Sequence, residues 1–128
     1  MPEQIDTSET GVVRLQTRPQ FLFVRDGHAE RRRALVVQAR MRRGSSQHIG
    51  AGFTATKKVG NAVVRNRAKR RLRAAASVLL AQYGVAGADY VFIARMETAT
   101  IGWQRLLDDM ESALISLAAM IQPGADKG

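Results

Sequence analysis

Two stretches in the middle of the chain alternate between apolar positions and positions that are polar or small, which is typical of β-strands. Residues 33–40 place Leu35, Val37 and Ala39 on one face. Residues 49–57 place four apolar residues on one face, namely Ile49, Ala51, Phe53 and Ala55. Because the loop between the two stretches is short, we predict that they pair as an antiparallel hairpin.

Helical periodicity is present in residues 62–83 and again in residues 100–121. In the first segment the apolar residues form one continuous stripe, which consists of Val64, Ala68, Leu72, Ala75, Leu79 and Tyr83. Asn61 is a suitable N-cap for this helix, and Gly84 is a suitable stop. In the second segment the apolar face contains Trp103, Leu106, Leu107, Met110, Leu114 and Leu117.

The remaining pattern completes an α+β fold. A short helix is predicted to begin near Pro19 and to end at Asp26 and Gly27, a buried strand covers residues 89–94, and residues 28–32 could add a short strand. The order α-β-β-α-β-α predicts a two-layer sandwich around a small, mostly antiparallel sheet. We expect a disordered tail over residues 1–13, one domain over residues 14–121 and a C-terminal tail over residues 122–128.

The number and distribution of charged residues indicate which kind of partner the protein binds. The chain has 128 residues, a formal net charge of +9 and no cysteine, so disulfides and thiolate zinc sites are excluded. Residues 31–73 contain fourteen Lys or Arg and no Asp or Glu. An uncompensated cationic surface of this size favours a nucleic-acid partner over a solvated face or an anionic membrane. With no signal-peptide pattern and no apolar run of about 18 residues, a cytoplasmic location is expected.

The basic residues of the long helix mostly avoid its apolar stripe. Asn66, Arg70 and Arg73 fall on the opposite side, while the flanks and the positions between are occupied by Arg65, Arg67, Lys69 and Arg71. A helix with one apolar stripe and cations on its other sides is suited to contact phosphates. This surface is therefore the main candidate for binding RNA.

Residues 52–73 read GFTATKKVGNAVVRNRAKRRLR, and this string resembles the signature of the bacterial ribonuclease P protein subunit, with Arg65-Asn66-Arg67 at its centre. The resemblance implies a protein cofactor of a catalytic RNA that removes the 5′ leader from precursor tRNA. It also implies a left-handed β-α-β crossover, and Mg²⁺ held mainly by the RNA subunit. The residues expected to bind the RNA subunit are Lys57, Lys58, Asn61, Arg65, Asn66, Arg67, Lys69, Arg70 and Arg73.

The resemblance further implies a cleft for the single-stranded leader between the first helix and the open face of the sheet. The candidate leader-binding residues are Phe21, Val36, Gln38, Arg40, Thr54 and Thr56. Small side chains and an aromatic ring in a positive groove suit single-stranded RNA. Phe21 could instead be a packing residue of its helix. Gln38 stands where family members often have another aromatic residue.

No protein active site is evident in the sequence. The basic half of the chain offers His28 and His48 but no Asp or Glu between Arg31 and Arg73, and Asp108, Asp109 and Glu111 are interpreted as a solvated helix face. We therefore expect no catalytic residue, no protein-held metal and no obligate protein partner. A general RNA-binding or ribosomal-type protein without a catalytic RNA partner is the alternative, and charge alone does not separate the two.

Overall fold

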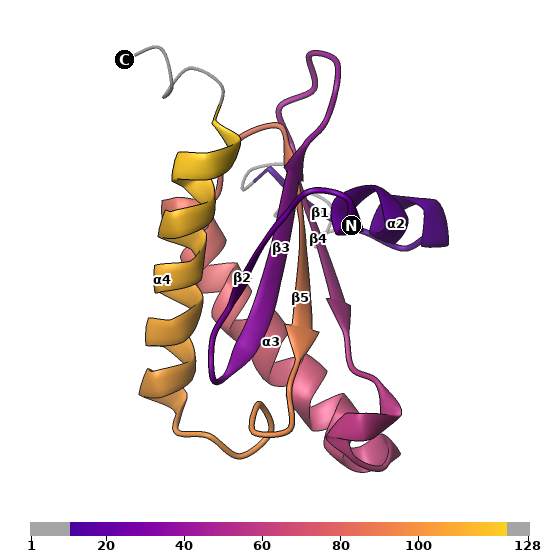
Figure 1. The fold of residues 1–128 in the computed structure, drawn as a ribbon, viewed down its shortest axis with the longest axis vertical. Coiled ribbons are helices and arrows are strands. Elements are labelled where there is room, and N and C mark those ends of the chain that lie inside the picture. The colour runs from indigo at the N-terminus through magenta and orange to yellow at the C-terminus, as the bar shows by residue number, and fades with distance from the viewer. Residues whose placement is uncertain (1–10, 123–128) are drawn as a thin grey trace, which may run out of the picture.

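The computed structural model describes residues 11–122, which form a single sheet with helices on both of its faces (Figure 1). The strands are β1 (Val12–Arg14), β2 (His28–Arg31), β3 (Leu35–Met41), β4 (Ile49–Thr54) and β5 (Ala88–Ala94). The helices are α2 (Arg18–Arg25), α3 (Ala62–Tyr83) and α4 (Trp103–Ile121), with a 3₁₀ turn at Lys57–Val59. α3 and α4 cover one face, and α2 lies on the other. The predicted α+β class is confirmed.

The sheet is mixed rather than mostly antiparallel. Its strand order is β1-β4-β5-β3-β2. β1 pairs with β4 and β4 with β5 in parallel, whereas β5 pairs with β3 and β3 with β2 in antiparallel fashion. Since β4 and β5 are parallel neighbours joined by α3, these three elements form the β-α-β unit that the resemblance implies.

The predicted hairpin between residues 33–40 and 49–57 is wrong, because β5 lies between β3 and β4. Every residue of β5 except Ile93 is buried. A strand that is apolar on both faces is most stable in the middle of a sheet, with helices on both sides. The loop after β3 thus connects two strands that are not neighbours in the sheet, and β5 occupies the position between them.

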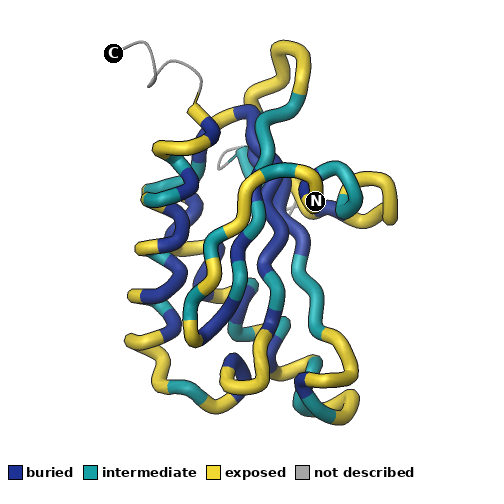
Figure 2. The backbone as a smooth tube through the Cα atoms, viewed as in Figure 1, coloured by how far each residue is buried: buried dark blue, intermediate teal, exposed yellow. Residues whose placement is uncertain are grey.

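The helical predictions agree closely with the structure. α3 has the predicted limits, and the Asn61 side chain accepts a hydrogen bond of 3.0 Å from the backbone nitrogen of Val64. Its buried residues are Ala68, Leu72, Ala75, Ala76, Leu79 and Leu80, which pack with α4 and the inner face of the sheet (Figure 2). α4 begins at Trp103, three residues later than predicted, after a turn in which Thr98 is buried.

A second, smaller apolar cluster fixes α2 on the outer face of the sheet. Leu15, Val24 and Val91 are buried there, and Phe21 packs against them. A capping box between Thr17 and Gln20 starts the helix, with Pro in its first turn as predicted. Burial of this apolar cluster therefore positions α2 on the outer face of the sheet, and α2 leaves other residues of that face accessible to solvent.

The ends of the domain differ from the prediction in detail. Residues 12 and 13 belong to β1, although we expected a disordered tail over residues 1–13. Residues 1–10 of that tail, and residues 123–128 of the C-terminal one, lie outside the described residues. β4 ends at Thr54, and Lys57 and Lys58 lie in the 3₁₀ turn. Residues 28–31 do form the additional strand. Within residues 11–122, no helix is long and apolar enough to span a membrane.

Candidate nucleic-acid interface

Seven cations gather around the N-terminal half of α3 and the turn before it. We call this set the cationic face; it comprises Lys57, Lys58, Arg65, Arg67, Lys69, Arg70 and Arg73. Each is exposed or half-buried. The ion pairs of the described residues involve other arginines, so no carboxylate neutralises this face. Unneutralised cations on a rigid helix are suited to bind phosphates.

The two asparagines of the predicted RNA-subunit site have different surroundings. Asn66 is exposed between Arg65 and Arg67. Asn61 is also exposed, but its side-chain oxygen already accepts the capping hydrogen bond from Val64. Only the side-chain NH₂ group of Asn61 is thus available to a ligand without loss of the cap.

Arg71 lies within the same basic run but has a structural role. Its guanidinium donates hydrogen bonds of 2.6 Å to the carbonyl oxygens of Thr98 and Ile101. It also lies 5.9 Å from the centre of the Trp103 ring. These contacts tie α3 to the segment before α4, which explains why Arg71 does not belong to the cationic face.

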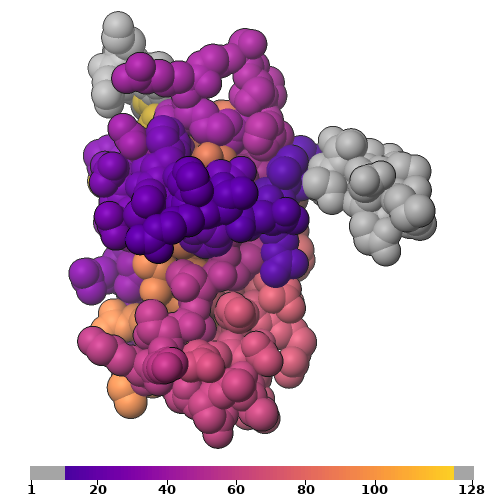
Figure 3. All heavy atoms as spheres, turned by 90° about the vertical axis from the view of Figure 1, so that its right-hand side faces the viewer, coloured from indigo at the N-terminus to yellow at the C-terminus, as the bar shows by residue number. Residues whose placement is uncertain are grey.

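The outer face of the sheet brings together the predicted leader-binding residues of β3 and β4. Val36, Gln38 and Arg40 alternate with the buried Leu35, Val37 and Ala39, as the sequence pattern predicts. Thr54 is half-buried at the end of β4, and Thr56 follows it, exposed. Figure 3 shows α2 crossing this face, with the magenta and orange segments of β4 and β5 at the surface below it.

Phe21 lies directly over Gly52. A Cβ atom on Gly52 would be 2.7 Å from two atoms of the Phe21 ring, so only glycine permits this contact. Phe21 remains half-buried and also belongs to the apolar cluster under α2. Its ring therefore packs against the strand floor and still borders the open part of the face.

Arg40 is already engaged by α2. Its guanidinium donates a hydrogen bond of 3.1 Å to the carbonyl of Phe23 and stands 4.4 Å from the centre of that ring. The cation–π contact and the hydrogen bond hold the C-terminal half of α2 on β3. Arg40 thus contributes to the position of the helix as well as to the charge of the surface.

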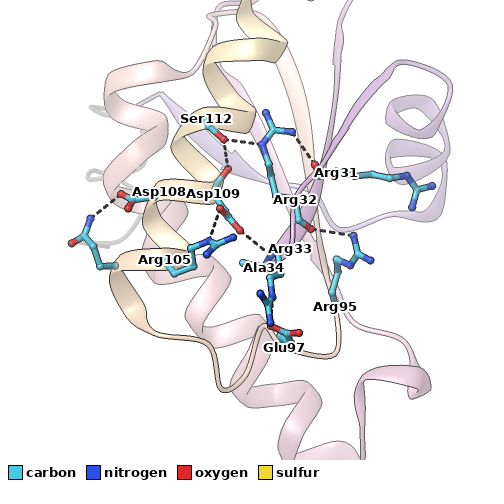
Figure 4. Close-up of polar contacts among 11 residues, drawn as sticks. Arg31, Arg32, Arg33, Ala34, Arg95, Glu97, Arg105, Asp108, Asp109 and Ser112 are labelled. Carbon is cyan, nitrogen blue, oxygen red and sulfur yellow. Dashed lines mark hydrogen bonds and ion pairs between the residues drawn. The ribbon is translucent and has the colours of Figure 1, made fainter.

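The acidic residues of α4 do not form one group, which corrects the interpretation of all three as a solvated face. Asp109 is buried, and its carboxylate accepts hydrogen bonds of 3.0 Å from the Ala34 backbone and from Arg105 (Figure 4). Asp108 is exposed and bonded to Gln104. Glu111 faces Tyr83 on α3, and its charge raises the pKa of that phenol. The sequence gives no signal of the Asp109 contact, because Ala34 is 75 positions away.

Asp89 is likewise committed to a structural contact. Its buried carboxylate pairs with Arg42 at 2.5 Å, and Arg42 also donates to backbone oxygens of Ala88, Ser46 and His48. This arginine fastens the loop between β3 and β4 to the start of β5. Within residues 11–122, no three His, Cys, Asp or Glu side chains form a group that could hold a metal ion.

Comparisons with known proteins agree with this arrangement. The Ribonuclease P family model matches residues 11–118. The chain is 51% identical over 114 residues to a ribonuclease P protein component of Caulobacter vibrioides, covering 89% of this chain and 76% of that one. It is 43% identical to the component of Ruegeria pomeroyi, covering 93% and 98%.

Solved structures agree in fold. The Staphylococcus aureus RNase P protein superposes with a TM-score of 0.68 at 26% identity, covering 81% of this chain and 94% of that one. The Thermotoga maritima protein superposes with a TM-score of 0.66 at 23% identity, covering 81% and 96%. With its cationic face on α3, its mixed sheet and a family match over most of its length, this chain belongs to the ribonuclease P protein family.

Proposed function

We propose that this protein binds the catalytic RNA of ribonuclease P through the cationic face, and the 5′ leader of precursor tRNA through the outer face of the sheet. The observation that carries the proposal is the set of seven unneutralised cations on α3 and the preceding turn. They include Arg65 and Arg67 of the Arg65-Asn66-Arg67 string at the centre of the resemblance. A rigid helix presents these charges together, so the RNA subunit meets them without ordering a loop.

The chemistry of leader removal is assigned to the RNA subunit, and Mg²⁺ is held mainly by its phosphates. Two features support this assignment. The Asp89 carboxylate is occupied by Arg42, and Asp108, Asp109 and Glu111 each have a separate partner. The protein's part is to bind, to position the leader and to reduce repulsion between two RNA chains.

Reconstitution tests the proposal. The protein is added to the catalytic RNA of ribonuclease P at low Mg²⁺, and the 5′ end of the product is mapped. We expect correct maturation of precursor tRNA under conditions in which the RNA alone is slow. A protein that binds this RNA without promoting cleavage would instead belong with general RNA-binding or ribosomal-type proteins.

Replacing the two histidines and the two acidic residues of α4 that are not buried should leave the rate of the chemical step unchanged. We expect Asp108→Asn, Glu111→Gln, His28→Ala and His48→Ala to retain nearly full cleavage by the reconstituted complex, because the proposal assigns catalysis to the RNA and none of these residues joins a metal-holding group within residues 11–122. Single-turnover rates at saturating Mg²⁺ provide the measurement. A loss of about 10⁴ for any variant, the scale of a missing acid–base group, would place the chemistry on the protein.

Phe21→Ala should weaken the binding of precursor tRNA by about tenfold, since stacking of one base on an aromatic ring contributes roughly 1–3 kcal/mol. The affinity for mature tRNA, which has no leader, should barely change. Leu22→Ala is the control, because Leu22 is half-buried in the same helix and belongs neither to the apolar cluster under α2 nor to the candidate leader-binding residues. Equal losses for precursor and mature tRNA, or a fall in Tm that accounts for the effect, would make Phe21 a packing residue.

A further inference from the structure

Below α2, four side chains form a straight row across the outer face of the sheet. Thr54 pairs with Ile93, Ile93 with Val36, and Val36 with Arg31. Cross-strand partners share a face, so the row runs from β4 through β5 and β3 to β2. With strands about 4.8 Å apart, it spans roughly 14 Å.

This row is open along its length, whereas the neighbouring one is covered over its Gly52 and Val91 part. The next row consists of Gly52, Val91, Gln38 and Ala29, and Phe21 lies over its Gly52 end. Gly52 and Val91 are buried, while Thr54, Ile93 and Val36 are half-buried and Arg31 is exposed. The open row is therefore a shallow apolar floor at the border of α2, with a hydroxyl at one end and a cation at the other.

The two ends of the row differ in what lies beyond them. At the Thr54 end the chain continues into Lys57 and Lys58, and hence into the cationic face. At the other end, β2 is an edge strand of the sheet. An RNA strand that lies along the row must therefore leave the domain next to Arg31.

Arg31 is the one residue of the triplet Arg31-Arg32-Arg33 whose guanidinium has neither a hydrogen bond nor an ion pair within the described part of the chain. Arg32 turns the opposite way and donates to Ser112 and Glu30, and Arg33 pairs with Glu97 at 2.9 Å. Figure 4 shows the Arg31 side chain extending away from α4, on the same side as Arg95. Arg95 is exposed and donates one hydrogen bond, to the carbonyl of Arg32.

We propose that the leader crosses the sheet along this row, from Thr54 to Arg31, and that Arg31, with Arg95 beside it, binds the phosphates of its distal nucleotides. The proposal rests on the proposed function, since it assigns a path and an end to the leader within that site. It follows that a leader too short to reach β2 gains nothing from Arg31. Arg31 is thus a determinant of leader length, and it carries no base specificity because it contacts the backbone.

The test compares Arg31→Ala with Arg33→Ala in the reconstituted holoenzyme. Both variants remove one cation from the same turn, and neither residue is buried. The precursor tRNAs carry either a leader of about two nucleotides or a leader of about ten nucleotides. Only the longer leader lies within the range of lengths that single-strand binding sites cover. For the long leader, Arg31→Ala should weaken binding about fivefold at ~0.15 M salt and lower the salt slope by about one. With the short leader, Arg31→Ala should bind as tightly as wild type. Arg33→Ala should bind both substrates as tightly as wild type, and Arg31→Lys should retain most of the affinity for the long leader.

The outcomes separate the inference from the proposed function. If wild type binds long and short leaders equally well, the leader site itself is wrong. If wild type prefers the long leader and Arg31→Ala keeps that preference in full, the leader is bound but does not end at β2. An equal loss for both leaders would assign Arg31 to another part of the RNA. Each of the last two results overturns the inference.

Discussion

Replacing Arg65, Arg67 and Arg70 together with alanine should lower the affinity for the catalytic RNA by about 100-fold at ~0.15 M salt. Each lost phosphate contact removes about 0.9 from the salt slope, which corresponds to roughly fivefold in affinity at that concentration. None of the three side chains has a hydrogen bond or an ion pair in the described residues that would be lost. Titrations at several salt concentrations measure both quantities, and Arg70→Ala alone should change the slope by about one.

The matched control removes three cations elsewhere, with Arg25, Arg33 and Arg43 replaced by alanine. All three residues are exposed, and none belongs to the cationic face. The net charge falls by the same amount, so a long-range field effect would weaken both triple variants alike. We expect the control to keep nearly all of the affinity. Equal losses would mean that overall charge, rather than α3, is responsible for docking.

Arg42→Ala should destabilise the fold by about 3–5 kcal/mol, the scale for removing one partner of a buried ion pair. The substitution leaves the Asp89 carboxylate buried and uncompensated, and it releases the loop carbonyls of Ser46 and His48. Chemical denaturation followed by circular dichroism measures the loss. The neighbouring Arg43 is exposed, so Arg43→Ala, with the same change of charge, should stay within about 0.5 kcal/mol of wild type.

A second substitution shows whether the uncompensated charge causes the loss. In the Arg42→Ala background, Asp89→Asn removes the buried charge and should recover part of the stability, although Asp89→Asn alone should be destabilising. This sign change is the signature of a coupled pair in a double-mutant cycle. If the two losses simply add, Arg42 stabilises the loop through its backbone contacts and not through Asp89.

The helices could be predicted because their signals are local. α3 has its cap at Asn61, its apolar stripe and its stop at Gly84 within one continuous segment, so the limits followed from neighbouring residues. α2 is similar, with Pro19 at its start and Asp26 at its end. The cationic face was predictable for the same reason, since exposure on a helix follows from the position of the apolar stripe.

Strand pairing could not be predicted in the same way. The alternation in β3 and β4 identified their faces, and the structure confirms them, but alternation contains no information about which strand lies next to which. The order of the strands depends on β5, whose buried residues require a central position in the sheet. β5 is distant in sequence from the segment it packs against, since Asp89 lies 47 positions after its partner Arg42.

The sequence by itself determined the limits of α2 and α3, the inner and outer faces of the strands and the cations around α3, because each depends on residues within a few turns of one another. Only the tertiary structure decided that β5 separates β3 from β4, that Asp109 and Asp89 are buried against Ala34 and Arg42, and that Arg31 stands in register with Thr54. These contacts join distant segments. Their partners are selected by the burial of the whole sheet between α2 and the α3–α4 layer, which no single segment encodes.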